Sequence, residues 1–241
     1  MKEPKVIFSN GMAKSGSTLL THYLLAMLSR AFPNNGQRAL REAIRSGKLT
    51  GSDDFVERID KPVVDLLYEI AERHGVIVVK IHCDTKPVLM EALRSGWVKM
   101  TFIHRDPRDT ILSGIDHNIR SGGTELPDYS SFEKALETAH WYAKVASHWL
   151  ASNLAYIVRY TDLVSDPRRA LAGVASYLRI GADSQILDAI VTEEQAQRRY
   201  GRNRFNRGEL QRYQKEMSEH HQTLCRSRLG NLLHTLGYSC Q

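Results

Sequence analysis

Short apolar runs alternate with helical patterns along most of the chain, and this alternation constrains the fold more than any other feature. Four runs are nearly continuous in apolar residues: Val6–Phe8, Val76–Lys80, Val98–Ile103 and Leu154–Tyr160. Such runs are typical of parallel strands that are covered on both faces. The expected helices are one with leucines at positions 20, 24 and 28, then Val63–Arg73, Val88–Arg94, Pro107–Ile119, Phe132–Leu150 and Pro167–Leu178. We therefore predict an α/β fold with a doubly wound parallel sheet flanked by helices, in which ligands bind beyond the carboxyl ends of the strands.

Two regions interrupt this rhythm. Pro33–Asp60 is polar and rich in Gly, Asn, Ser and Arg, so we expect a loop or mobile flap over residues 31–60. Residues 192–241 contain no convincing strand and are expected to form helices and loops that cover the sheet. No linker or repeat divides the chain, and we predict a single domain over residues 1–241.

The charge and the cysteines narrow the class of protein. The chain has 33 Lys and Arg against 27 Asp and Glu, a net charge of +6, which favours an anionic ligand such as a nucleotide, a nucleic acid or a lipid headgroup. The three cysteines include no C-x-x-C, which argues against a disulfide framework and a zinc site. No apolar stretch approaches the ~20 residues of a membrane span, and the N-terminus enters a strand directly. We expect a cytoplasmic protein.

The stretch VIFSNGMAKSGSTLL, from Val6 to Leu20, nearly matches the loop that holds nucleoside triphosphates. Gly11 and Gly16 have the G-x-x-x-x-G spacing, but Ser17 stands where the loop lysine should follow, and the lysine is Lys14. A strand, a turn and a helix place unpaired backbone N–H groups around an anion. The backbone of residues 14–18 and the hydroxyls of Ser17 and Thr18 could bind a phosphate in this way. An ordinary strand–helix turn is the alternative.

This stretch resembles the 5′-phosphosulfate loop of the cytosolic-type sulfotransferases that use 3′-phosphoadenylyl sulfate (PAPS). The resemblance implies a P-loop-like sulfotransferase fold, PAPS as the co-substrate and no metal. It assigns the loop contacts to Lys14, Ser15, Gly16, Ser17 and Thr18. Lys14 would contact the oxygen that bridges sulfate and phosphate and stabilise the leaving adenosine bisphosphate. Many relatives have Trp where this chain has Leu19.

A second anchor lies in FIHRDPRDTILSGIDH, residues 102–117. Asp106 is a good N-cap, Pro107 fits the first helical position, and Asp109 suits the positive end of a helix. A strand therefore ends at Arg105, and Ser113 lies two turns into the following helix. The segment resembles the family's 3′-phosphate site, which would consist of Arg105 and Ser113. Without that resemblance, Arg105 would be expected to pair with a nearby carboxylate.

A candidate base follows the strand VIVVKIHCDTK. Side chains alternate along a strand, so Lys80 and His82 share a face and reach the same crevice as Lys14. A neighbouring ammonium group keeps an imidazole neutral, as a general base requires. The family carries Lys-x-His here, which implies that His82 is the base and that Lys80 supports the transferring sulfuryl group. We expect Cys83 to be buried, with a nucleophilic role as the alternative.

The remaining matches to family motifs, at Tyr160 and at Arg207–Gly208, are less complete. Tyr160 follows a strand and resembles the family's residue near the adenine, although a structural, partly buried tyrosine fits equally well. Arg207 and Gly208 match the last two positions of a segment that closes over the 3′-phosphate in relatives, with Asn206 in place of an arginine. The surrounding arginine-rich run also fits a solvated face or a nucleic-acid contact.

Together the motifs predict transfer of a sulfuryl group from PAPS to a hydroxyl, or an amine, of an acceptor. The acceptor could be a small molecule, a glycan or a lipid, chosen by the 31–60 flap, the Cys83–Lys86 turn and the Ser121–Ser130 loop. Two alternatives stay open: a P-loop kinase that uses ATP and Mg²⁺, and a non-catalytic RNA-binding module. We expect no nucleic-acid partner, because the chain lacks the interleaved aromatic residues of an RNA module. The sequence gives no indication of oligomeric state.

Overall fold

The computed structural model describes residues 5–200 and 209–240. Within these ranges the central sheet has six strands in the order β2-β3-β4-β1-β5-β6. The strands are β1 Val6–Gly11, β2 Gly51–Ser52, β3 Phe55–Val56, β4 Ile77–Ile81, β5 Val98–His104 and β6 Tyr156–Arg159. All pairings are parallel except that of β2 with β3. The doubly wound parallel sheet predicted from the apolar runs is confirmed.

The register brings the carboxyl ends of three strands together. β1 lies at the centre, with Val6 opposite both Ile77 of β4 and Val98 of β5. At its other end Asn10 is opposite Ile81, and Gly11 is opposite Ile103. The polar residues that follow β1, β4 and β5 therefore meet at one edge of the sheet, where ligands bind in such folds.

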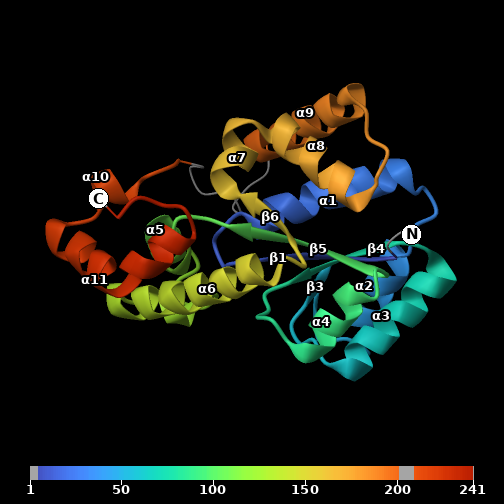
Figure 1. Ribbon diagram of the computed structural model, residues 1–241, viewed down its shortest axis with the longest axis horizontal. Coiled ribbons are helices and arrows are strands. Elements are labelled where there is room, and N and C mark those ends of the chain that lie inside the picture. The colour runs from blue at the N-terminus through green and yellow to red at the C-terminus, as the bar shows by residue number, and fades with distance from the viewer. Residues whose placement is uncertain (1–4, 201–208, 241) are drawn as a thin grey trace.

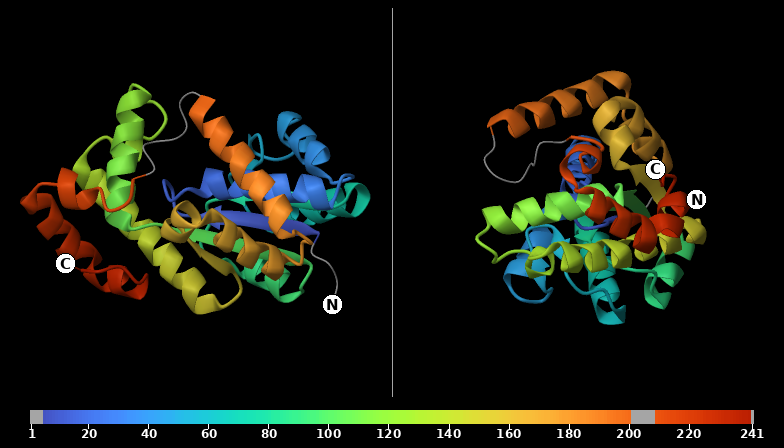
Figure 2. Two further views of the ribbon diagram at one scale, coloured as in Figure 1. Left: turned by 90° about the horizontal axis from the view of Figure 1, so that it is seen from above. Right: turned by 90° about the vertical axis from the view of Figure 1, so that its left-hand side faces the viewer.

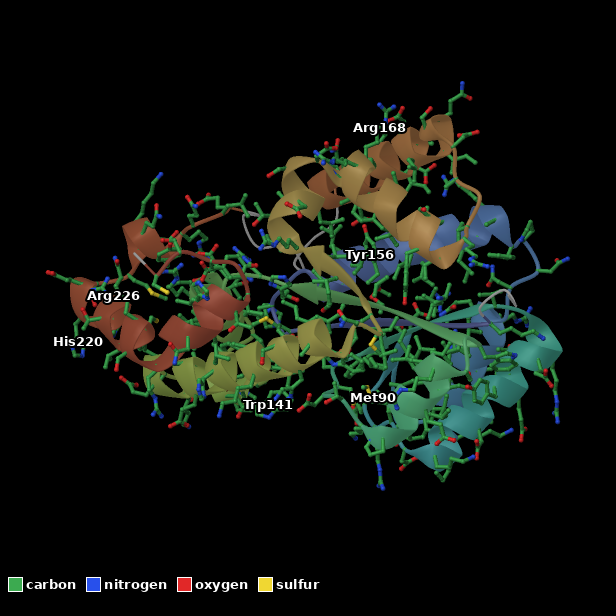
Figure 3. The ribbon with its side chains drawn as sticks, in the orientation of Figure 1. Met90, Trp141, Tyr156, Arg168, His220 and Arg226 are labelled. Atoms are coloured by element: carbon green, nitrogen blue, oxygen red, sulfur yellow. The ribbon has the colours of Figure 1, made fainter. Side chains whose placement is uncertain are left out.

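Helices cover both faces of the sheet, as Figure 1 shows. On one face are α1 Ser17–Ala31, α7 Tyr160–Ser165, α8 Pro167–Leu178 and α9 Ser184–Tyr200. On the other are α2 Gln37–Arg45, α3 Lys61–His74, α4 Pro87–Arg94 and α6 Phe132–Ser152. Each face has its own apolar core, and the side chains of β1 alternate between them: Ile7 belongs to one, Phe8 to the other. In Figure 3, Tyr156 marks the first face and Met90 the second.

A third core lies beyond the end of the sheet. It is built from α6, α5 Pro107–Arg120, the short 3₁₀ helix η1 Pro127–Tyr129, α10 Tyr213–Glu216 and α11 Glu219–Thr235. Figure 2 shows this helical lobe extending from the side of the sheet, with the C-terminus on it. Residues 209–240 thus form helices and turns, as expected for this end of the chain, but their buried side chains pack mainly on α5 and α6, whereas the sequence predicted a cover over the sheet.

The region 31–60 differs from the expected loop. Residues 37–45 form α2, and 51–56 form the β2–β3 hairpin. The helix was not apparent because it is short and its apolar side consists only of Leu40, Ala43 and Ile44. Gln37 joins it to the sheet: its amide oxygen accepts from the Val78 N–H at 2.9 Å, and its amide nitrogen donates to the Val78 carbonyl at 2.8 Å. This side chain takes the place of a neighbouring strand at the edge of β4.

Prolines mark the starts of several helices, as predicted for Pro107 and Pro167. Pro87, Pro107 and Pro167 each begin a helix, where the missing N–H costs nothing. The side chain of Asp106 caps α5 by accepting from the Arg108 N–H at 3.0 Å. Among the described residues, no helix combines the length and apolar character that crossing a bilayer would require.

Candidate active site

The loop between β1 and α1 has an unusual backbone. Lys14 has φ 62° and Gly16 has φ 89°, both in the left-handed region. Ser15 fixes the loop from behind: its hydroxyl donates to the Met12 carbonyl at 2.7 Å and lies 3.1 Å from that of Ile103. Its N–H also points to the Met12 carbonyl, at 3.3 Å. Ser15 is therefore a structural residue of the loop, whereas the sequence suggested a phosphate donor.

A cavity of about 380 Å³ opens in front of this loop. It brings together nearly all the site residues expected from the sequence: Lys14, Gly16, Ser17, Thr18, Lys80, His82, Arg105, Ser113 and Tyr160. Leu19 also lines the cavity, with Phe55 of the 31–60 region and Leu126 of the Ser121–Ser130 loop. The remaining walls come from residues that the sequence did not single out: Ala13, His117 and Tyr142. Ser15 lies outside the lining, and Arg207 and Gly208 lie outside the described residues.

Lys14 sits among other cations. Burial is the main cause that lowers the pKa of its ammonium group to about 8, and the charges of Arg120, Lys80 and Arg105 lower it further. Glu125 acts in the opposite direction. Within the described part of the chain, the Lys14 ammonium group makes no hydrogen bond. A cluster of positive charge with so little compensation favours a polyanionic ligand.

Lys80 and His82 face the cavity from the end of β4, as the alternation of the strand predicts. The Lys80 ammonium group donates to the Thr18 hydroxyl at 2.8 Å, which joins the end of β4 to the start of α1. The His82 Nδ1 lies 2.7 Å from the Gly11 carbonyl oxygen. A carbonyl only accepts, so Nδ1 carries the hydrogen and the lone pair is on Nε2.

Burial lowers the pKa of His82 to about 4, and the positive charge of Lys80 contributes in the same direction. The bond to Gly11 raises this pKa but does not compensate. The imidazole is therefore neutral at pH 7. Its ring lies between those of Phe55 and Tyr142, with centroids 5.4 and 6.3 Å away.

Asn10 holds the chain immediately after His82. Its amide nitrogen donates to the Cys83 carbonyl at 2.8 Å, and its amide oxygen accepts from the Cys83 N–H at 3.1 Å. The last residues of β1 thus fix the backbone that follows His82. Burial raises the pKa of the Cys83 thiol, which disfavours the thiolate that a nucleophile needs.

Arg105 is buried at the end of β5. Its Nη2 donates to the Glu209 carbonyl at 2.7 Å and lies 3.4 Å from Asp109 Oδ2. Its guanidinium group stacks 4.5 Å from the centre of the Tyr160 ring. Its Nε is buried without a hydrogen-bond partner among the described residues. Buried donors are normally satisfied, so this one is explained best by a bound acceptor.

Gly16 is required by the packing of Tyr160. A Cβ at this position would lie 2.5 Å from the tyrosine Cδ2, and the backbone φ of 89° adds strain for any other residue. Tyr160 therefore packs tightly between the loop and Arg105, and its ring also lines the cavity. Tyr160 thus has the structural role that the sequence offered as one alternative. Its position in the cavity wall also allows it to lie beside a ligand.

Asp109 is the main site residue whose role the sequence did not reveal. Its carboxylate accepts from the Gln211 N–H at 2.9 Å and from the Tyr213 N–H at 3.2 Å. It thus fastens residues 209–213 beside Arg105. The sequence shows only an acid in the first turn of a helix, and its partners are about one hundred positions away.

Within the described residues, no three His, Cys, Asp or Glu side chains gather as metal ligands would.

Comparisons with known proteins agree with this fold. Retinol dehydratase in complex with androsterone and the inactive cofactor PAP is similar with a TM-score of 0.62 and 16% identity, over 97% of this chain and 82% of that one. A mouse sulfotransferase complexed with PAP has a TM-score of 0.64 and 13% identity, over 97% and 86%. A sulfotransferase from Alicyclobacillus acidocaldarius has a TM-score of 0.52 and 15% identity, over 98% and 95%.

The search of curated proteins finds no match. A family model described as "Sulfotransferase domain", however, matches residues 4–228 and so includes every element from β1 to α10. The chain belongs to the sulfotransferase domain family.

Proposed function

We propose that this protein transfers the sulfuryl group of PAPS to a hydroxyl or amine of an acceptor and releases adenosine 3′,5′-bisphosphate (PAP). The observation that carries the proposal is the charge arrangement of one cavity. Lys14, Lys80 and Arg105 line it from three different elements, and the buried Nε of Arg105 lacks a partner in the described residues. Two of the structures similar in fold hold PAP, a molecule with a phosphate at each end of its ribose.

The loop and the arginine would hold the two ends of the nucleotide. The N–H groups at the start of α1 and the hydroxyls of Ser17 and Thr18 suit the 5′-phosphosulfate. Arg105 and Ser113 suit the 3′-phosphate, because a guanidinium fork and a hydroxyl both donate to it. Tyr160, packed on Arg105, would stand beside the base.

In the reaction, the acceptor oxygen or nitrogen forms a bond to sulfur while the bond from sulfur to the bridging oxygen breaks. Lys14 would donate to that bridging oxygen as negative charge develops on the leaving bisphosphate. The acceptor proton would pass to Nε2 of His82, the ring nitrogen that the bond to Gly11 leaves free. Lys80, held by Thr18, would stabilise the sulfuryl oxygens.

Calorimetric titration tests the nucleotide first. PAP should bind without Mg²⁺ and more tightly than ATP. The alternative of a P-loop kinase predicts the reverse, ATP in preference to PAP and a requirement for Mg²⁺. An RNA-binding module would bind RNA with a steep dependence on salt and would be indifferent to Lys14→Ala. Transfer of label from ³⁵S-PAPS to members of an acceptor library then tests the reaction.

A further inference from the structure

A second cavity, of about 360 Å³, adjoins the active site. We name it the arginine cavity, and its lining is Thr18, Thr21, His22, Arg41, Arg45, Ser52, Asp53, Asp54, Phe55, Lys80 and His82. Four of these residues also line the active-site cavity: Thr18, Phe55, Lys80 and His82. The two spaces therefore meet at the candidate base, and a molecule in the arginine cavity can present a hydroxyl to it.

The wall of the arginine cavity is preformed by a hydrogen-bond network. Arg41 on α2 binds Asp54 in the β2–β3 turn through two bonds, Nε to Oδ1 at 2.7 Å and Nη2 to Oδ2 at 2.9 Å. Gln37 donates to the same carboxylate at 2.7 Å and also bonds to β4. The Asp54 carbonyl accepts from the Lys80 N–H at 2.8 Å. Helix, turn and strand are thus held together, and little ordering is left for a ligand to impose.

The lining is polar in character. Phe55 is its single apolar side chain among the described residues, and its ring lies under His82 and Lys80. The other groups are hydroxyls, two carboxylates, two imidazoles, two guanidinium groups and the Lys80 ammonium group. An apolar ring placed here would displace the water that these polar groups bind. It would offer no hydrogen bonds in return, which is costly. Hydroxyl groups of an acceptor would replace them.

Arg45 gives the cavity its specific charge. It lies one turn after Arg41 on α2, so two guanidinium groups are neighbours on one face of the helix. Arg41 is paired with Asp54, whereas Arg45 is exposed and has no hydrogen bond or ion pair within the described residues. A free, planar guanidinium group at the rim of a polar cavity matches a carboxylate or a phosphate.

We propose that the acceptor is a hydroxyl-rich molecule with a carboxylate or phosphate group, which Arg45 binds while one hydroxyl faces His82. The inference rests on the proposed function, because it assigns the acceptor of that same site. The competing surface is the apolar part of the active-site cavity, formed by Leu126 and Tyr142. A site that used this surface would instead select apolar alcohols such as phenols.

The test compares matched acceptors on the wild-type enzyme and two variants. Glucuronate and glucose 6-phosphate carry the two anionic groups, glucose carries neither, and 4-nitrophenol represents the apolar class. Binding to the enzyme–PAP complex is measured by calorimetry, and transfer from ³⁵S-PAPS is measured with each acceptor. The variants are Arg45→Ala and Arg38→Ala, since Arg38 is on the same helix but pairs with Glu42 away from the cavity.

At least one anionic sugar should bind the PAP complex more tightly than glucose and 4-nitrophenol do. Arg45→Ala should weaken that binding about tenfold, the change expected for one charge-assisted contact, and leave glucose unaffected. Arg38→Ala should change neither. A preference for 4-nitrophenol, equal affinities for glucose and the anionic sugars, no binding of either sugar, or indifference to Arg45→Ala would overturn the inference. Failure of PAP itself to bind would instead refute the proposed function.

Discussion

Two titratable side chains of the site have pKa values displaced in the same direction with different consequences. The pKa of Lys14 is lowered to about 8, so its ammonium group stays charged at neutral pH. The pKa of His82 is lowered to about 4, so its imidazole is neutral there. The proposed reaction needs both of these states at once. Burial beside like charges is the common cause, and it produces an acid–base pair suited to neutral pH.

The pH dependence of kcat/KM follows from these two values. Activity should fall as the pH decreases through about 4, because His82 gains a proton and can no longer accept one. It should fall again as the pH rises through about 8, because Lys14 loses its charge. Rates between pH 3.5 and 10 with a fixed acceptor measure the profile. A fall centred near pH 6.5, the ordinary pKa of histidine, would contradict the assigned environment of His82.

Removal of either side chain should lower turnover strongly. Lys14→Ala and His82→Ala are each expected to reduce kcat about 100-fold or more, since each removes a group that acts on developing charge or on the transferred proton. Lys134→Ala, an exposed residue of α6, is the control for a lost lysine. Steady-state transfer of label from PAPS is the measurement. Full activity of His82→Ala would show that another group accepts the proton.

Gly16 provides a steric test of the loop. Gly16→Ala places a methyl group against the Tyr160 ring at 2.5 Å and should displace the ring from Arg105, so PAP affinity should fall at least tenfold, roughly the cost of one charged contact. Gly96 is the matched control, because its φ of 75° is also positive but nothing lies within 4 Å of its Cβ position. Gly96→Ala should therefore show only the backbone strain, about 1–2 kcal/mol, with unchanged PAP binding. Equal PAP affinity in both variants would contradict the packing argument.

The sequence predicted which residues gather at one cavity where position along a strand determines position in space. Lys14 and Arg105 follow β1 and β5, Lys80 is near the end of β4, and the parallel register brings those strand ends together. It predicted less well where a side chain had two possible directions. Ser15 turns behind the loop toward Met12, and nothing in the local pattern distinguishes this from a turn toward the cavity.

At the scale of elements, the success and failure of prediction have the same cause. β1, β4 and β5 are buried almost throughout, so most of their residues are apolar and the strands can be recognised. α2 and the β2–β3 hairpin contribute few apolar side chains to the core and depend also on polar contacts. Gln37 bonds to Asp54 and β4, and Arg41 bonds to Asp54. Polar partners from three elements leave no periodic signal, and the segment resembles a loop in sequence.

Asp109 joins α5 to residues 211–213 through hydrogen bonds to their backbone. Asp109→Asn keeps the shape of the side chain but removes the charge that faces Arg105, and it weakens acceptance from the Gln211 and Tyr213 N–H groups. We expect the Kd for PAP to rise about tenfold with a smaller change in kcat, because Arg105 loses its support and Lys14 and His82 keep theirs.

Asp128→Asn is the control for Asp109, since Asp128 is an exposed residue of η1. Calorimetry gives the Kd, and transfer of label at saturating PAPS gives kcat. A purely structural role would lower the melting temperature and leave the Kd for PAP unchanged. That result would remove Asp109 from the positioning of the nucleotide.

At the scale of the whole molecule, the helical lobe is joined to the sheet by a few buried polar contacts next to the site. The Tyr238 hydroxyl lies 3.0 Å from Nδ1 of His104, at the end of β5. Arg108, at the start of α5, is fully buried and donates to the Asp106 carboxylate at 2.7 Å and to the Ser239 carbonyl at 2.7 Å. Its guanidinium group also stacks 3.7 Å from the centre of the Tyr213 ring. The turn from β5 into α5 thus places Arg105 at the active-site cavity and Arg108 against the lobe.

Arg108 should therefore matter for folding more than for catalysis. Arg108→Met removes the charged partner of the Asp106 carboxylate, which stays buried. Because a buried, unpaired charge is costly, we expect the free energy of unfolding to fall by about 3–5 kcal/mol. Asp106→Asn in the Arg108→Met background should recover part of that loss, because the unpaired charge is gone. Denaturant unfolding of the single and double variants measures both effects, with Arg38→Ala as an exposed control. If the double variant is as unstable as the sum of the two single variants, the two side chains are not coupled, and the Arg108–Asp106 ion pair is not what stabilises this junction.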